Sequence, residues 1–209
     1  MLKALAEKLK IRLQSPMPGA EAHEPLRAYA VGNLKAKFEH KLPPKPGSVL
    51  ILLYEEEGVI KFPLTKRPNY PGAHGGQISF PGGKAEQGEL VEQTALREGQ
   101  EEIGVIPGEL TILGKLSNFF VIPSNFIVTP IVAIADKTPD FHPDPREVER
   151  IIIGRLMDLT TDDAVKQKEI LVSNQFQMMA PHFEIDGEIV WGATAMMLNE
   201  FRIILREII

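Results

Sequence analysis

One segment, residues 89–103, constrains this chain more than any other, because it reads as an amphipathic helix that carries several like charges on one face. The apolar residues recur at helical spacing, and Gly104 follows as a helix-ending glycine. At about 100° per residue, Glu98, Glu101 and Glu102 share one side of this helix. Like charges at positions i and i+4 repel, so the Glu98–Glu102 pair weakens the helix unless it serves another purpose.

Converging carboxylates have a ready use as hard oxygen ligands for Mg²⁺ or Mn²⁺. The alternative is an acidic helix face that simply meets solvent. Arg97 borders the acidic face and can hold a carboxylate through a bidentate bond. Before the helix, Gly82 and Gly83 form a tight loop whose backbone can approach a metal ion or a phosphate. Gly99 lies at the centre of the neighbouring apolar stripe, where a missing side chain permits close packing on a sheet.

This segment resembles the box of the Nudix hydrolase family, which reads G-x5-E-x7-R-E-U-x-E-E-x-G-U with U a bulky apolar residue. The single departure is Gly99, at the first U position, and it removes packing rather than a ligand. Eight positions match at the required spacing: Gly83, Glu89, Arg97, Glu98, Glu101, Glu102, Gly104 and Val105.

The resemblance implies roles for these residues. Glu98 and Glu102 bind the divalent ions, and Glu101 is a further ligand or assists the general base. Arg97 orients the catalytic carboxylates, and the backbone carbonyl of Gly83 is an extra ligand. The implied fold is the Nudix α/β/α sandwich with a mixed β-sheet.

Three further carboxylates lie near these residues in the sequence or match the family's pattern. By the same resemblance, Glu89 supports the loop–helix–loop unit. Outside the box, Glu147 and Glu149 precede an apolar strand and have the pattern of a salt-bridged strand edge. The family often draws an additional group from outside the box, so Glu147 is also a candidate metal ligand or general base.

Upstream, the chain resembles the second signature of the coenzyme A pyrophosphatase branch, approximately L-L-T-x-R-[SA]-x3-R-x3-G-x3-F-P-G-G. Arg67 is expected to contact the diphosphate. The signature's second Arg is replaced by Gly72, and Lys66 or His74 is expected to compensate as a phosphate partner. Pro63 and Pro68 are the other departures. The matching positions are Leu64, Thr65, Arg67, Gly76, Phe80, Pro81, Gly82 and Gly83.

The rest of the chain predicts an N-terminal helix and irregular arm over 1–47, followed by one Nudix domain over 48–209. Leu2, Leu5, Leu9 and Leu13 share a stripe that predicts a docking helix. From residue 48 the hydrophobic patterns predict a mixed sheet with helices packed on it. The expected strands cover 49–54, 59–67, 110–120, 126–135, 148–153, 175–185 and 188–191, and the final helix covers 193–208.

Composition narrows the class of function. The formal net charge is −5 over 209 residues, which argues against non-specific binding to nucleic acid or to an anionic membrane. No apolar run approaches the length of a membrane span. The chain has no Cys, which excludes disulfides, thiolate metal sites and a Cys nucleophile. The absence of Cys suits a reducing compartment. Charged residues are spread through the first 14 residues, which is unlike the pattern of a secretory signal, so we expect a cytoplasmic location.

The sequence therefore predicts a metal-dependent hydrolase of a pyrophosphate bond in a nucleotide derivative, with coenzyme A or its thioesters preferred and Mg²⁺ or Mn²⁺ as cofactor. One alternative is a Nudix enzyme for ADP-ribose or another nucleoside diphosphate derivative. The other is a Nudix module that binds a nucleotide without hydrolysing it. A homodimer through the N-terminal arm is a further hypothesis.

Overall fold

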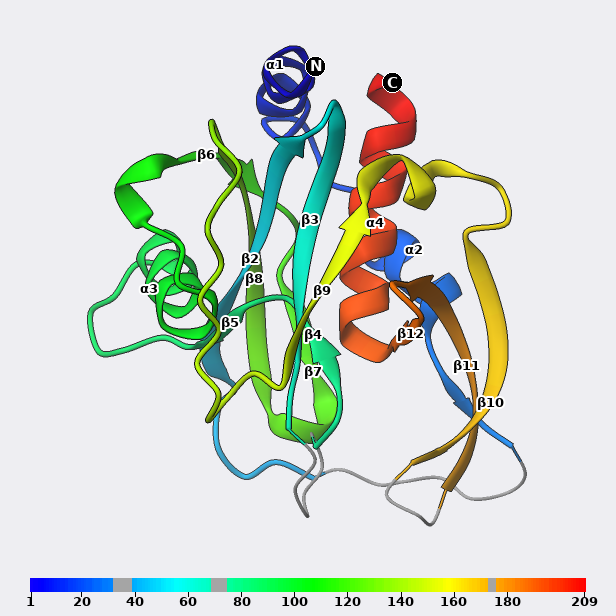
Figure 1. The fold of residues 1–209 in the computed structure, drawn as a ribbon. Coiled ribbons are helices and arrows are strands. Elements are labelled where there is room, and N and C mark those ends of the chain that lie inside the picture. The colour runs from blue at the N-terminus through cyan, green and yellow to red at the C-terminus, as the bar shows by residue number, and fades with distance from the viewer. Residues whose placement is uncertain (32–38, 69–74, 173–175) are drawn as a thin grey trace.

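The computed structural model describes residues 1–31, 39–68, 75–172 and 176–209. A mixed sheet forms the centre, with α3 (Val91–Ile103) on one face and α4 (Gly192–Ile208) on the other (Figure 1). A second, smaller sheet packs on the side of α4 that faces away from the central sheet. The predicted α/β sandwich with a mixed sheet is confirmed.

Within the described residues, no helix combines the length and the apolar character that crossing a membrane requires. The remaining helices are α1 (Leu2–Arg12) and α2 (Ala20–His23), and the strands are β1 (Tyr29–Ala30), β2 (Lys45–Glu56), β3 (Val59–Lys66), β4 (Ile78–Ser79), β5 (Gly82–Lys84), β6 (Leu110–Lys115), β7 (Phe119–Val121), β8 (Phe126–Ala135), β9 (Arg150–Arg155), β10 (Val165–Val172), β11 (Phe176–Ile185) and β12 (Glu188–Trp191).

Strand β2 is the centre of the main sheet. It pairs in parallel with β8 and antiparallel with β3 and β5, while β9 extends the sheet beyond β3. Successive side chains of a strand point to opposite faces, so a strand covered on both sides needs apolar residues at every position. Val49, Ile51 and Leu53 accordingly pack on the α4 side, and Leu50 and Leu52 pack on the α3 side. This double burial explains the continuous apolar run of residues 49–54.

Helix α3 packs closely against β2 at Gly99, the one position where the box departs from the family pattern. A Cβ atom built on Gly99 would lie 2.7 Å from Leu50 Cδ2 and 3.3 Å from Val105 Cγ2. The Leu50 side chain thus occupies the space that a bulky residue at position 99 would need. At the end of the helix, Gly104 adopts the left-handed conformation with φ of 75°, as its position predicts.

Several elements differ from the sequence prediction. The strand expected over 110–120 is two strands, β6 and β7, because the chain crosses from one segment of β8 to another. Strand β10 was not predicted, and β10, β11, β12 and β1 form a sheet of their own. The arm over 15–47 contains α2, a 3₁₀ turn and β1, and β2 begins at Lys45. The domain boundary at residue 48 stays a prediction.

The N-terminal segment is built into the core of the chain. Leu2, Leu5 and Leu9 of α1 are buried in the same apolar cluster as α4, which confirms the predicted docking helix. Beyond α1, the fully buried Glu200 of α4 accepts hydrogen bonds from the backbone N–H of Gly19 at 2.9 Å and pairs with His23 Nε2 at 3.0 Å. The arm is therefore fixed by polar as well as apolar contacts.

We expect Gly99→Val to lower the free energy of unfolding by about 1–3 kcal/mol, because its side chain would overlap Leu50 in a packed interface. Adding Leu50→Ala should recover part of this loss by vacating the space. Urea unfolding of the two single variants and the double variant measures the coupling. Purely additive losses would show that the two side chains do not compete for one space.

Glu200 predicts a specific pH dependence of stability. Burial by itself raises the pKa of Glu200, but hydrogen bonds from His23, Ser117 and Gly19 outweigh it and hold the pKa below its ordinary value. A lowered folded-state pKa stabilises the fold above the ordinary pKa of about 4.5, and this contribution is lost as the pH falls through the folded value. Glu200→Gln should therefore weaken the dependence of unfolding free energy on pH below about 5. Equal slopes for wild type and Glu200→Gln would contradict the assignment.

Candidate active site

The two glycines before α3 are required by the packing around them. Strand β5 pairs with β2, and a Cβ atom on Gly82 would lie 2.4 Å from the backbone oxygen of Ser48. A Cβ atom on Gly83 would lie 2.5–2.6 Å from the carboxylate atoms of Glu98. The bare backbone of Gly83 therefore lies directly against a carboxylate of the helix. The sequence prediction placed both groups in one site, and the structure brings them together.

Arg97 connects the box carboxylates. Its guanidinium donates two hydrogen bonds to Glu89, at 2.9 and 3.1 Å, in a bidentate arrangement. Its Nη1 group also donates to Glu98 at 2.8 Å and to Glu101 at 2.9 Å, and Nη2 donates to the backbone oxygen of Lys84 at 3.1 Å. The hydrogen bonds that Arg97 donates to Glu89, which have the largest effect, and to Glu98 raise the pKa of Arg97. One cation thereby fixes the strand before the helix, the start of the helix and its acidic face.

Glu89 closes the turn into α3. Its carboxylate accepts the backbone N–H of Glu86 at 2.9 Å and the hydroxyl of Thr94 at 2.8 Å, in addition to Arg97. These hydrogen bonds, with that from Arg97 the largest effect, lower the pKa of Glu89 to about 2. Glu89 is thus ionised and fully engaged, as expected of a residue that supports the loop.

Glu98 and Glu102 carry negative charge into a buried region. Burial raises the pKa of Glu102 to about 7, although Arg67 and the backbone N–H of Gly82 act in the opposite direction. Burial also raises the pKa of Glu98, and the Arg97 hydrogen bond partly offsets the effect. Repulsion from Glu147 raises the pKa of both carboxylates, and repulsion from Glu98 raises that of Glu102 further. This arrangement would be relieved by a cation.

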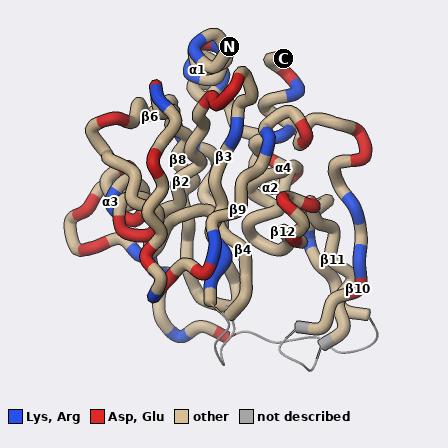
Figure 2. Tube along the Cα trace, viewed as in Figure 1, with Lys and Arg blue, Asp and Glu red and all other residues tan. Residues whose placement is uncertain are grey.

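Glu147 lies on the segment between β8 and β9, which runs beside α3 (Figure 1). Backbone N–H groups of His142 and Asp144 donate to the carbonyls of Ile103 and Glu102, each at 3.0 Å. These bonds fasten the segment to the last turn of α3, and the exposed Glu147 follows directly. Figure 2 shows acidic positions gathered on α3 and along this segment. Sequence reasoning missed Asp144, although Asp-Pro at 144–145 is a turn signal.

Arg67 lies beside the buried carboxylate. Its Nη2 atom is 3.6 Å from Glu102 Oε1, and its side chain is partly exposed. The neighbouring Lys66 points elsewhere, because it pairs with Glu188 at 2.9 Å and with Glu149 at 3.7 Å. Lys66 is thus engaged in the strand-edge ion pairs that the sequence pattern suggested. His74 and Gly72 lie outside the described residues.

The donors fit a hard divalent cation in kind. The carboxylates of Glu98, Glu102 and Glu147 and the backbone carbonyl of Gly83 are all oxygen donors. Within the described ranges, no three His, Asp or Glu side chains stand together as a finished ligand set. Each is held by a different partner, Glu98 by Arg97 and Glu102 by Gly82 N–H at 3.3 Å. The predicted metal ligands therefore stay a prediction.

A separate cleft of ≈ 390 Å³ lies between β9 and the β10–β11 pair. Its lining includes Phe62, Gly154, Lys166 and Phe183, and its charged rim residues Lys166 and Glu184 pair with one another. None of the residues predicted for the site lines this cleft, so we do not assign the chemistry to it.

Comparison with known proteins places these residues in a family. The NUDIX domain model matches residues 44–173, which include the whole box and Glu147. The chain belongs to the Nudix family. It is 28% identical over 214 residues to Nudix hydrolase 22, chloroplastic, of Arabidopsis thaliana, covering 94% of this chain and 70% of that protein. It is 27% identical over 191 residues to an uncharacterized Nudix hydrolase, NudL, of Pectobacterium atrosepticum, covering 84% and 95%.

Among solved structures, the Nudix hydrolase RenU from M. smegmatis aligns with a TM-score of 0.48 and 21% identity, covering 56% of this chain and 74% of that chain. Sequence relatives named as Nudix hydrolases support hydrolase chemistry for this Nudix chain. Nudix hydrolases use divalent metal cations. The predicted family is confirmed, and the coenzyme A pyrophosphatase branch stays a prediction.

We expect Arg97→Lys to weaken the site even though the charge is kept. A lysine cannot form the bidentate bond to Glu89 while also reaching Glu98 and Glu101. Mn²⁺ affinity, measured by titration calorimetry, should fall about 10-fold or more. Arg27→Lys is a matched control outside the box, at an exposed arginine that pairs with Glu24, and it should bind Mn²⁺ as wild type does. Wild-type affinity in Arg97→Lys would show that the guanidinium does not organise the carboxylates.

Proposed function

We propose that this Nudix protein is a metal-dependent pyrophosphohydrolase of nucleoside diphosphate derivatives, with coenzyme A or its thioesters as preferred substrates. The carrying observation is the partly exposed cation Arg67 at 3.6 Å from the buried carboxylate of Glu102, which also feels the charges of Glu98 and Glu147. A diphosphate bound through a divalent cation would meet both signs of charge there. Products would be adenosine 3′,5′-bisphosphate and 4′-phosphopantetheine or its acyl form.

Each residue has a role in this proposal. Glu98 and Glu102 hold Mg²⁺ or Mn²⁺, with the Gly83 carbonyl and Glu101 as further donors. A bound divalent cation neutralises phosphate charge and makes a coordinated water more acidic. Arg67 contacts the diphosphate and offsets charge on the bridging or leaving phosphate oxygen.

In this proposal a carboxylate accepts the proton of the attacking water. The two candidates for this general base are Glu101 and Glu147. The Glu101 carboxylate is held by Arg97 at 2.9 Å on the exposed side of α3, and its charge acts on Glu98, whereas the charge of Glu147 acts on both Glu98 and Glu102. This difference favours Glu147 as the general base, with Glu101 supporting the acidic face.

The coenzyme A preference rests on the second signature around Arg67. Coenzyme A carries a 3′-phosphate that ADP-ribose lacks, and Lys66 is already paired with Glu188 and Glu149. His74 and Lys84 are left as the nearby cationic candidates. A cytoplasmic location is part of this proposal, as is a nucleotide substrate rather than nucleic acid or a membrane. The homodimer stays a hypothesis, and the apolar stripe of α1 is already buried within the same chain.

One substrate panel tests the reaction and the preference together. Coenzyme A, dephospho-coenzyme A and ADP-ribose are compared by kcat/KM with Mg²⁺ and with Mn²⁺, and products are identified by mass. We expect coenzyme A to be hydrolysed, with dephospho-coenzyme A slower by about one to two powers of ten, the effect of one charge-assisted hydrogen bond. Tenfold or greater preference for ADP-ribose would replace the branch assignment with the ADP-ribose alternative.

Variants separate catalysis from binding in the same assay. Glu102→Gln should remove nearly all turnover while the thermal unfolding midpoint stays high, because it deletes a metal ligand without deleting volume. Glu92→Gln is a matched control on the same helix and should remain active. If wild type binds metal and nucleotide but cleaves none of the three compounds, the non-catalytic binding module is the better description.

A further inference from the structure

The position of Glu147 depends on one short turn, residues 144–148. The backbone carbonyl of Asp144 accepts the N–H groups of Glu147 at 3.0 Å and of Val148 at 2.8 Å. The buried Val148 anchors the far end of this turn in the protein. The direction in which the Glu147 side chain leaves the backbone is therefore set by Asp144.

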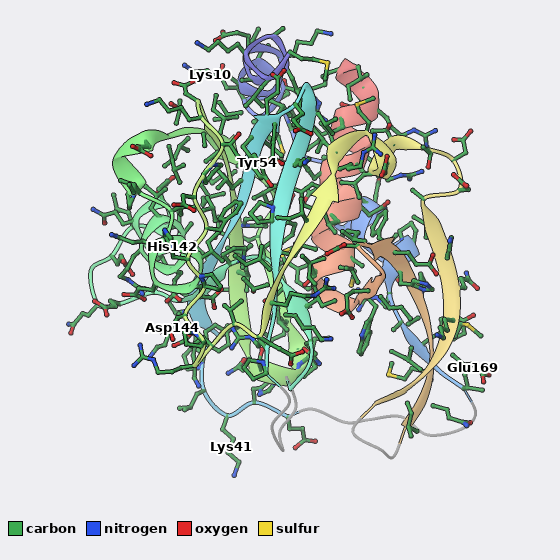
Figure 3. All side chains as sticks on the ribbon, viewed as in Figure 1. Lys10, Lys41, Tyr54, His142, Asp144 and Glu169 are labelled. Atoms are coloured by element: carbon green, nitrogen blue, oxygen red, sulfur yellow. The ribbon has the colours of Figure 1, made fainter. Side chains whose placement is uncertain are left out.

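Asp144 is also bound to the helix that carries the other carboxylates. Its backbone N–H donates to the carbonyl of Glu102 at 3.0 Å. One turn earlier, His142 packs against Gly104, where an added Cβ would come within 2.8 Å of His142 Cβ. Figure 3 shows His142 and Asp144 along the segment that passes α3. Asp144 thus touches, through its backbone, both Glu102 and Glu147.

The Asp144 side chain holds this backbone in place. Oδ1 accepts the backbone N–H of Arg146 at 2.9 Å, and the two carboxylate oxygens accept the Arg146 guanidinium at 2.6–3.1 Å. The Asp144 side chain is 20% exposed, whereas that of Arg146 is 86% exposed. Arg146 therefore covers the carboxylate from the solvent side, and Asp144 is the inner member of the pair.

We propose that Asp144 is a positioning residue that fixes Glu147 opposite Glu98 and Glu102. This inference rests on the proposed function, because it assigns Asp144 to the metal site of that reaction. Without the Asp144 carboxylate, the turn loses its bond to Arg146 N–H, and Glu147 is no longer held toward the helix. A residue that merely stabilised the loop would change the stability of the protein without acting through Glu147.

A double-mutant cycle distinguishes these two roles. Asp144→Ala, Glu147→Gln and the double variant are compared with wild type by Mn²⁺ dissociation constant, measured by electron paramagnetic resonance, and by kcat on the best substrate of the panel. Each single variant should weaken Mn²⁺ binding and lower kcat by about 10–100-fold. The double variant should be no worse than Glu147→Gln, because Asp144 acts through Glu147.

Two further variants make the outcome decisive. Asp144→Asn keeps one acceptor oxygen for Arg146 N–H, so it should fold and show a smaller loss than Asp144→Ala. Asp140→Asn removes a carboxylate from the same segment, one that pairs with the exposed His142 side chain at 3.2 Å, and should match wild type. Wild-type Mn²⁺ affinity in both Asp144 variants, or losses that multiply in the double variant, would overturn the proposal.

The Mn²⁺ measurement separates this inference from the proposed reaction. Mn²⁺ binding with the expected coupling but without hydrolysis of any compound would refute the reaction and retain the role of Asp144. Hydrolysis without coupling between Asp144 and Glu147 would retain the reaction and refute the role.

Discussion

The acidic site is held together by the guanidinium of Arg97. It reaches Glu89 before the helix, Glu98 and Glu101 on the helix and the Lys84 carbonyl on β5. A planar group with five donors can satisfy partners in several directions at fixed angles, which an ammonium cannot do. Because β5 is itself paired to β2, this one cation ties the acidic helix face to the central strand of the fold.

Charging the buried carboxylate of Glu102 lowers the stability of the fold. Burying Glu102 raises its pKa to about 7, and repulsion from Glu98 and Glu147 adds to the cost of charging it. A chain selected for stability alone would place apolar or paired residues there. The buried carboxylate of Glu200 has a different environment, because hydrogen bonds from His23, Ser117 and Gly19 satisfy its oxygens and lower its pKa. The charge of Glu200 is thus compensated within the fold, whereas that of Glu102 is compensated only in part.

The structure also shows why the helix tolerates its departure from the family pattern. Leu50 of β2 fills the space left by Gly99, so the α3–β2 interface is packed without a bulky residue at that position. The missing side chain is therefore compensated from the opposite surface, and the acidic face is unaffected.

The sequence by itself determined the acidic helix, its C-terminal glycine, the two-glycine loop and the doubly buried strand, because these follow from local periodicity and spacing. The box residues Glu98, Glu101, Glu102 and Arg97 were predicted for the same reason, since one helix fixes their relative positions. Tertiary structure alone decided which distant groups join them. The sequence left Glu147 open between a salt-bridged strand edge and a site residue, and it gave no sign of the backbone bonds from His142 and Asp144 that bring its segment beside the end of α3. Lys66 and Arg67 are adjacent in sequence, but their side chains leave the backbone in different directions. Lys66 pairs with Glu188, whereas Arg67 lies beside Glu102. The second sheet and the buried His23–Glu200 pair likewise depend on contacts between residues far apart in the chain, which no local pattern encodes.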